Sequence, residues 1–276
     1  MANKVLVFTL SLIMQLSLNA TVDVSVANIH DIEANFIEQQ ESIVASDINQ
    51  PIKDEVIQDV NTTQPTKDEQ NKRVIDPNKP MVALTYDDGP SKYTAEILDI
   101  LKENNSAATF FVLGMQVNKY DEVIVRMVEE GNQIGNHSYD HKRLTTLNDE
   151  ELHNQINVTD NLIYKTALYK PFVMRPPYGS TNAELEKKLQ KPVINWSVDT
   201  RDWESRNTEA IVDIVLKNVK DGDIILMHDL YKTSVEASKI VIPELIKRGY
   251  QLVTVSELSE NKDIILKAGN LYYHMH

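Results

Sequence analysis

The stretch MVALTYDDGP, residues 81–90, begins as an apolar run and ends in two adjacent carboxylates. The apolar part predicts a buried β-strand, and the Gly-Pro pair marks the point where that strand ends. In α/β proteins the functional side chains gather where parallel strands end. Asp87 and Asp88 therefore stand where such a protein places its chemistry, although Asp before Gly is also common in ordinary turns.

Short apolar runs alternate with amphipathic stretches after this strand. The expected strands are 82–86, 107–112, 133–136, 172–174, 193–198, 223–228 and 251–255. The expected helices are 93–103, 119–130, 149–167, 183–189, 208–219 and 235–247. The alternation predicts an α/β fold with about seven mainly parallel strands, closed or nearly closed as a distorted (β/α) barrel, with an open doubly wound sheet as the alternative. No Gly-x-Gly-x-x-Gly or Walker signature supports a nucleotide-binding fold.

Three regions of different composition divide the 276 residues. Residues 1–20 combine one lysine, a short apolar run and a small residue at Ala20, as secretory signal peptides do, with an uncleaved membrane anchor as the alternative. Residues 21–79 are acidic and have Phe36 as their single aromatic, so we expect a disordered linker. Residues 80–276 are expected to form one globular domain.

Composition excludes several classes of function. A net charge of −13 and the lack of a basic patch give no electrostatic basis for binding nucleic acid. The chain has no cysteine, so any metal must be held by histidine and carboxylate. Export and a flexible tether favour a secreted or cell-surface protein with a substrate outside the membrane.

Polar side chains follow several of the other predicted strands. The segment GNHSYDH spaces His137 and His141 at i and i+4, which would place both imidazoles on one side of a helical turn, but such a pair alone is a weak metal signal. The remaining strand-end residues are Arg175 in VMRPPYG, Asp199, Asp202 and Trp203 in VDTRDW, and His228 in IILMHD. Each has an ordinary interpretation as a surface or capping residue. Their convergence on one rim of a sheet predicts a catalytic site.

The five segments TYDDGP, HSYDH, RPPYG, DTRDW and LMH resemble, in this order, the five motifs of polysaccharide deacetylases with a NodB homology domain, carbohydrate esterase family 4. The resemblance covers residues 80–273. One departure is Tyr86, where the family usually has phenylalanine. The C-terminal GNLYYHMH, in which His274 and His276 look like a frayed end, is also similar to the end of Gram-positive peptidoglycan N-acetylglucosamine deacetylases.

The resemblance implies a division of labour between the paired carboxylates. Asp88, His137 and His141 would bind one divalent metal, with Zn²⁺ the first choice and Co²⁺ or Mn²⁺ the alternatives. Three protein ligands with an open position are also the general arrangement of catalytic zinc. Asp87 would be the general base, and Arg175 would orient it.

The resemblance also implies a general acid and a substrate pocket. His228 would protonate the leaving amine, with Asp202 as the carboxylate that keeps it charged and Asp199 as a second candidate. The backbone N–H of Tyr178 would stabilise the oxyanion. The apolar wall around the acetyl methyl would be formed by Trp203 and Leu226, with core packing as the alternative role of Leu226.

The implied activity is hydrolysis of N-acetyl groups from N-acetylglucosamine residues of an extracellular polysaccharide. Peptidoglycan is the first substrate, chitin or chitooligosaccharides the second, and acetylxylan the third. A metal-free glycosidase and a catalytically silent glycan-binding domain are the alternatives from other classes. The protein is expected to act as a monomer, without nucleic acid and without membrane insertion beyond an N-terminal anchor.

Overall fold

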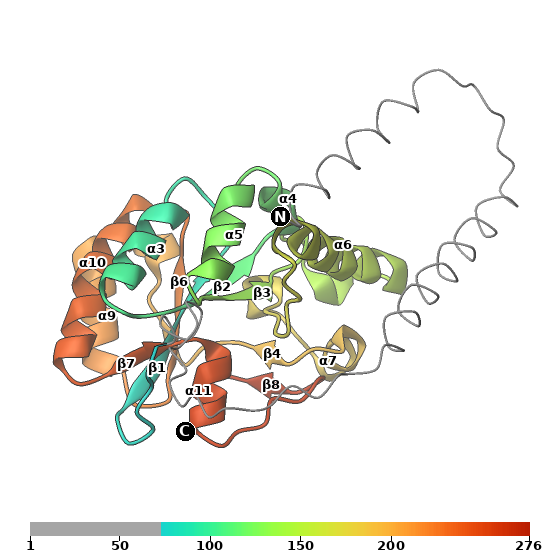
Figure 1. The fold of residues 1–276 in the computed structure, drawn as a ribbon. Helices are drawn as coiled ribbons and strands as arrows, with labels where there is room; N and C mark the ends of the chain where they lie inside the picture. Colours follow the sequence, from blue (N-terminus) through green and yellow to red (C-terminus); the bar gives the residue numbers. More distant parts are fainter. Residues whose placement is uncertain (1–72) are drawn as a thin grey trace, which may run out of the picture. The chain divides into compact units, whose positions relative to one another are not determined.

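The computed structural model describes residues 73–276 (Figure 1). The predicted signal peptide or anchor and residues 21–72 of the predicted linker lie outside the described residues. Within the described part, no helix has both the length and the apolar character needed to cross a membrane.

The packed domain begins several residues before the predicted boundary at residue 80. Arg73 donates two hydrogen bonds to the Glu257 carboxylate, at 2.6 and 2.7 Å, and a third to the Leu252 carbonyl. The backbone of Asp76 exchanges hydrogen bonds with the side-chain amide of Gln251. Residues 73–79 therefore belong to the domain and not to the linker.

The strands of the described part form a mainly parallel sheet. They are β1 (Met81–Asp87), β2 (Thr109–Val112), β3 (Gln133–Asn136), β4 (Val193–Ile194), β5 (Val198–Asp199), β6 (Ile224–His228), β7 (Gln251–Val253) and β8 (Leu271–Tyr272). Strand β1 is central: it pairs with β6 along one edge and with β7 and then β2 along the other.

The sheet closes on itself through residues 193–199. The order β3-β2-β1-β6-β5 is continuous, and β4, just before β5 in the chain, bridges Met174, which bridges Asn136 of β3. These links confirm the predicted distorted (β/α) barrel.

Helices cover the outside of the barrel (Figure 1). The longer ones are α3 (Thr94–Glu103), α5 (Asp121–Glu129), α6 (Asp149–Ala167), α7 (Ala183–Leu189), α9 (Thr208–Asn218), α10 (Lys232–Lys247) and α11 (Val255–Asn261); the four-residue α4 (Gly114–Val117) and α8 (Asp202–Ser205) lie in strand-to-helix connections. Asn148 and Glu151 form the capping box at the start of α6, which satisfies backbone N–H groups that the helix leaves unpaired.

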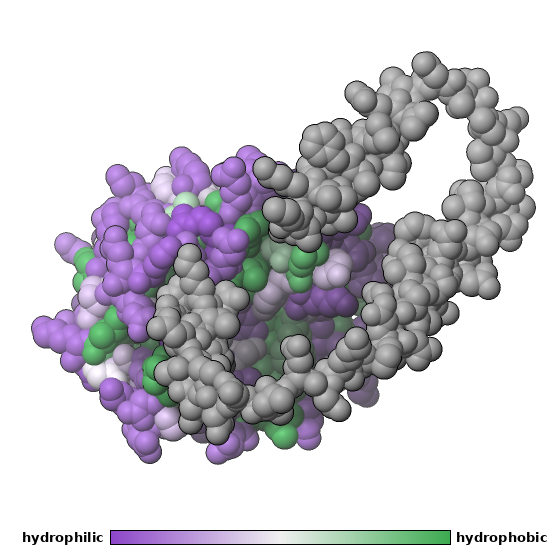
Figure 2. Space-filling model, in the orientation of Figure 1, coloured by the Kyte–Doolittle hydropathy of each residue, from purple (hydrophilic) through white to green (hydrophobic). Residues whose placement is uncertain are grey.

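Alternation along β1 explains both the core and the position of the site. Val82, Leu84 and Tyr86 face outward into the main core under α3 and α10. Burial of an apolar side chain of this size stabilises the folded state by about 1.5–3 kcal/mol. The Tyr86 hydroxyl is satisfied by a 2.8 Å hydrogen bond with Ser238, away from the site. Thr85 and Asp87 face the opposite way, into the barrel. On the face drawn in Figure 2 the described surface is mostly hydrophilic, as expected when the apolar side chains are inside.

Three predicted elements differ from the structure. The expected strand 172–174 is reduced to single bridges at Met174, because prolines at 171 and 176 flank it and proline cannot donate to a ladder. The expected strand 193–198 is split into β4 and β5, because the carbonyls of Ile194 and Asn195 turn toward the Arg175 guanidinium. The C-terminus is not frayed: Met275 is fully buried, and His276 contacts Asp223. Strand β8 and helices α4, α8 and α11 were not predicted.

Candidate active site

The candidate site lies at the C-terminal ends of the barrel strands. Asp87 is the last residue of β1 and Asp88 directly follows it, and His137 directly follows β3. Asp88 and His141 both adopt the left-handed backbone conformation, with φ of 72° and 64°. Non-glycine residues in this region cost about 1–3 kcal/mol each and concentrate at functional sites.

Asp88, His137 and His141 form a cluster of potential metal ligands. The Asp88 Oδ1 atom lies 3.3 Å from His137 Nε2 and 3.2 Å from His141 Nε2, and one ligand atom from each residue lies within 4.8 Å of the other two. The predicted helical turn for the two histidines is wrong: they lie in a loop in which Ser138 has a φ of 71°. The loop turns both imidazoles toward the same carboxylate.

The cluster fits a divalent metal. Two imidazoles and one carboxylate match the ligands of catalytic zinc sites, and Asp88 Oδ1 is a buried oxygen without a hydrogen bond among the described residues. The Arg175 carbonyl lies 2.6 Å from His137 Nδ1, as outer partners of metal-bound histidines do. Burial alone would raise the pKa of Asp88, but the close contact with His137 and the charges of the neighbouring histidines lower it to about 2, so the carboxylate is ionised.

Arg175 holds Asp87 in place. This arginine is fully buried, and its Nη1 donates to Asp87 Oδ1 at 2.7 Å and to Thr85 Oγ1 at 2.8 Å. Its Nε and Nη2 atoms donate to the backbone carbonyls of Ile194 and Asn195. Its guanidinium lies 4.2 Å from the centroid of the Phe111 ring. A buried ion pair supported by three further hydrogen bonds from the same guanidinium holds the Asp87 carboxylate in place.

His228 and Asp202 form a second pair beside the first. The register of β1 and β6 places His228 opposite Asp87, and His228 Nδ1 lies 2.7 Å from Asp202 Oδ1. Asp202 also accepts hydrogen bonds from the His228 backbone N–H and from the Ser234 hydroxyl. Burial alone would lower the pKa of His228, but the hydrogen bond and charge of Asp202, with smaller contributions from Asp87 and Asp88, raise it to about 9.

Asp199, the second candidate partner of His228, makes no hydrogen bond or ion pair with His228 within the described part of the chain. Asp199 Oδ1 instead accepts the Arg201 backbone N–H at 2.8 Å. Tyr178 and Trp203 stand at the open rim, 60% and 47% exposed. Leu226 is buried on the same face of β6 as His228, two residues away.

Sequence reasoning missed three residues that contact the site. Thr85 could have been found, because it precedes Asp87 by two residues and therefore shares its face of the strand. Asp229 follows His228 directly and is fully buried, and burial raises its pKa to about 7. Ser234 gives no such signal, since only the packing of α10 brings it to Asp202.

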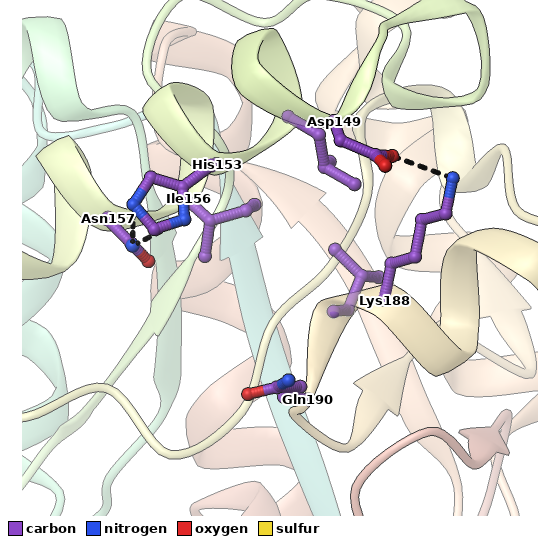
Figure 3. Close-up of a pocket in the computed structure, with 8 residues that line it drawn as sticks. Asp149, His153, Ile156, Asn157, Lys188 and Gln190 are labelled. Atoms are coloured by element: carbon purple, nitrogen blue, oxygen red, sulfur yellow. Dashed lines mark hydrogen bonds and ion pairs between the residues drawn. The ribbon is translucent and has the colours of Figure 1, made fainter.

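A separate pocket lies between α6 and α7 (Figure 3). It has a volume of about 450 Å³, and an ion pair between Asp149 and Lys188 crosses one side of it. His153 projects from α6 beside Asn157. None of the candidate site residues lines this pocket.

Comparison with known proteins assigns the family. Residues 75–194 match the family model described as polysaccharide deacetylase. A Bacillus cereus protein named peptidoglycan-N-acetylglucosamine deacetylase is 37% identical over 194 residues, which cover 67% of this chain and 91% of that protein. The chain belongs to the polysaccharide deacetylase family, carbohydrate esterase family 4.

Two other members of the family are similar in sequence and structure. The peptidoglycan-N-acetylmuramic acid deacetylase PdaC of Bacillus subtilis is 48% identical over 189 residues, which cover 68% of this chain and 40% of PdaC. The solved PdaC structure superposes with a TM-score of 0.67 over 68% of this chain and 94% of that structure. A family 4 acetyl xylan esterase from Clostridium thermocellum, solved with a cobalt ion, is 34% identical with a TM-score of 0.67, covering 70% of this chain and 98% of that one. The chain thus spans about two fifths of the length of PdaC.

Proposed function

We propose that this chain is a metal-dependent deacetylase that removes N-acetyl groups from the amino sugars of peptidoglycan. The observation that carries the proposal is the placement of Asp87 and His228 opposite each other on the paired strands β1 and β6, each held by a buried partner, Arg175 or Asp202, next to the cluster of Asp88, His137 and His141. N-acetylglucosamine is the first substrate. N-acetylmuramic acid is the second, because it is the substrate named for PdaC.

The two pairs supply opposite proton transfers. Asp87, held by Arg175, accepts the proton of the attacking water. His228, with a pKa of about 9, is protonated at neutral pH; its Nδ1 is hydrogen-bonded to Asp202, so its Nε2 would donate the proton to the leaving amine. Amide hydrolysis needs both, since an amine leaves only after protonation.

The remaining site residues shape the substrate pocket. The backbone N–H of Tyr178 would donate to the developing oxyanion, and the φ of 63° at this residue reflects its constrained turn. Trp203 and Leu226 would enclose the acetyl methyl group. The exposed aromatic rings at the rim offer flat surfaces on which a sugar ring can stack.

A divalent metal, with Zn²⁺ the first choice, would be held by Asp88, His137 and His141. When bound there, it supplies Lewis-acid polarisation of oxygen atoms. The acetyl xylan esterase solved with a cobalt ion supports metal binding by a protein of this fold.

One assay separates this function from its alternatives. The chain is incubated with an N-acetylglucosamine oligomer and with peptidoglycan, with and without a chelator, and released acetate and new reducing ends are measured. A deacetylase releases acetate and loses activity with the chelator. A metal-free glycosidase would create reducing ends instead, and a silent glycan-binding domain would bind the oligomer without releasing either product.

The cellular location is part of the same proposal. Peptidoglycan lies outside the cytoplasmic membrane, and residues 1–20 have the composition of a signal peptide or anchor. A secreted or cell-wall-associated protein would be found in the medium or in the wall fraction.

A further inference from the structure

Asp229 is a buried carboxylate beside the site for which the proposed chemistry has no use. It follows His228 directly and is fully buried. Its Oδ2 accepts a hydrogen bond from the Thr94 hydroxyl, and its Oδ1 has no hydrogen-bond partner within the described residues. Burying a carboxylate with an unpaired oxygen costs folding free energy, so its presence here indicates a specific role.

The Asp229 carboxylate lies against the backbone that follows the paired carboxylates. A β-carbon built on Gly89 would lie 2.1 to 2.5 Å from its Oδ2, Oδ1 and Cγ atoms. Real β-carbons do not approach other atoms so closely, so position 89 accommodates only glycine while Asp229 is in place. The glycine in TYDDGP is therefore required by a side chain that directly follows β6.

Two hydroxyl residues complete the connection. The Ser91 hydroxyl donates to the Asp229 carbonyl, and the Ser91 backbone N–H donates to Thr94 Oγ1 at 2.7 Å. The Thr94 hydroxyl in turn donates to Asp229. The loop that leaves β1 is thus fastened to the chain that leaves β6, just beyond the last paired residues, Asp87 and His228.

We propose that Asp229 is a positioning residue that fixes the separation between the Asp87–Asp88 pair and His228. This inference rests on the proposed function. Asp88 needs such support, because its left-handed backbone is strained and persists only where neighbouring structure imposes it. Without the contact, the end of β1 can shift relative to β6, and a displacement of about 1 Å can cost about 10²-fold in rate.

The test compares Asp229→Ala with Asp229→Asn in the full chain. We expect the alanine variant to lower kcat on an N-acetylglucosamine oligomer by about 10- to 100-fold with KM nearly unchanged, and to weaken Zn²⁺ binding, measured by competition with a chelating dye, by a similar factor. The asparagine variant should restore both, because its amide oxygen still accepts the Thr94 hydroxyl. An asparagine variant as impaired as alanine would overturn the proposal, since the charge of Asp229 would then be what matters.

The matched control is Asp223→Ala, because Asp223 directly precedes β6 as Asp229 directly follows it. Asp223 is also buried, and it accepts hydrogen bonds from the Lys220 backbone N–H and the Ser197 hydroxyl. Its loss should lower stability but leave kcat and Zn²⁺ affinity unchanged. If Asp229→Ala behaved in the same way, the positioning role would be refuted.

A second pair of variants covers a failure of Asp229→Ala to fold. Thr94→Val removes the hydroxyl that holds Asp229, and Thr94→Ser retains it. We expect valine to lower kcat and Zn²⁺ affinity and serine to restore them, and equal behaviour of the two would overturn the proposal. If the unaltered protein released no acetate, the proposed function would fail, and Zn²⁺ affinity would still test the positioning role.

Discussion

At the scale of single residues, the site depends on side chains whose partners are fully specified. Arg175 donates hydrogen bonds to Thr85, to Asp87 and to two backbone carbonyls, and these bonds restrict the orientation of the Asp87 carboxylate. His228 has one nitrogen engaged by Asp202. The same chemistry on mobile surface residues would lack this preorganisation.

Replacing Asp202 with asparagine should shift the pH profile. His228 must be protonated to act as an acid, so activity is lost as pH rises through its pKa of about 9. Without the Asp202 charge, burial dominates and lowers that pKa, and the alkaline limb of kcat/KM should move to lower pH. Asp199→Asn is the matched control, because Asp199 contacts Arg201 instead, and it should leave the limb in place. An unchanged limb in Asp202→Asn would show that another group titrates there.

Asp87→Asn should separate catalysis from metal binding. The amide keeps the size of the side chain but cannot accept the proton, so kcat should fall by about 10²-fold or more while Zn²⁺ stays bound. Metal content and kcat measured on the same preparation check this. Loss of the metal from Asp87→Asn would make Asp87 a ligand instead of the base.

His141→Ala should remove the metal and the activity together. Its imidazole is one of the three clustered ligands, whereas His153 on α6 is exposed and lies outside the cluster. His153→Ala is therefore the control and should keep both. Full activity of the purified protein after exhaustive chelation would contradict the metal assignment.

At the scale of elements, the site is built from side chains at the ends of strands and in the loops that follow them. The parallel pairing of β1 with β6 places Asp87, the proposed base, opposite His228, the proposed acid, and the loop after β3 contributes His137 and His141. Helices contribute as well: the short α8 carries Asp202 and Trp203, and α10 brings Ser234 to Asp202.

Removing the cap of α6 should destabilise the fold. Asn148 accepts the Glu151 backbone N–H at 3.0 Å, and Asn148→Ala should cost about 1 kcal/mol in the free energy of unfolding. Asn154→Ala, at an exposed position inside the same helix, should be neutral or slightly stabilising, because alanine favours helix. Urea denaturation of the two variants makes the comparison, and equal stabilities would show that the cap contributes nothing.

At the scale of the whole molecule, segments distant in sequence close the barrel. Residues 193–199 join the two edges of the sheet, and the C-terminal tail adds the bridge between Asp223 and His274. At the other end of the described chain, Arg73 fastens residues 73–79 to α11.

The position of the domain boundary can be tested by shortening the chain. A protein starting at Arg73 should keep its melting temperature and its rate on small soluble substrates. One starting at Val74 loses the Arg73–Glu257 ion pair, which is largely buried, and should be less stable by about 1 kcal/mol with the same rate. A large loss of stability in the chain that starts at Arg73 would show that the preceding residues contribute to the fold.

The α/β class, the family and most of the residues of the candidate site could be predicted from the sequence, whereas Thr85, Asp229 and Ser234 could not or were not. The alternation of strands and helices is a local pattern, as is the position of Asp87 and His228 at strand ends. Local patterns can be recognised in a single sequence. Tertiary structure alone decided the rest. The loop conformation of His137 and His141, the split of strand 193–198 beside Arg175, the hydrogen bond from Ser234 to Asp202 and the contact of Asp229 with Gly89 all depend on groups far apart in sequence. Such contacts form only when the barrel closes, and no local pattern encodes which distant atom will satisfy a buried donor or charge.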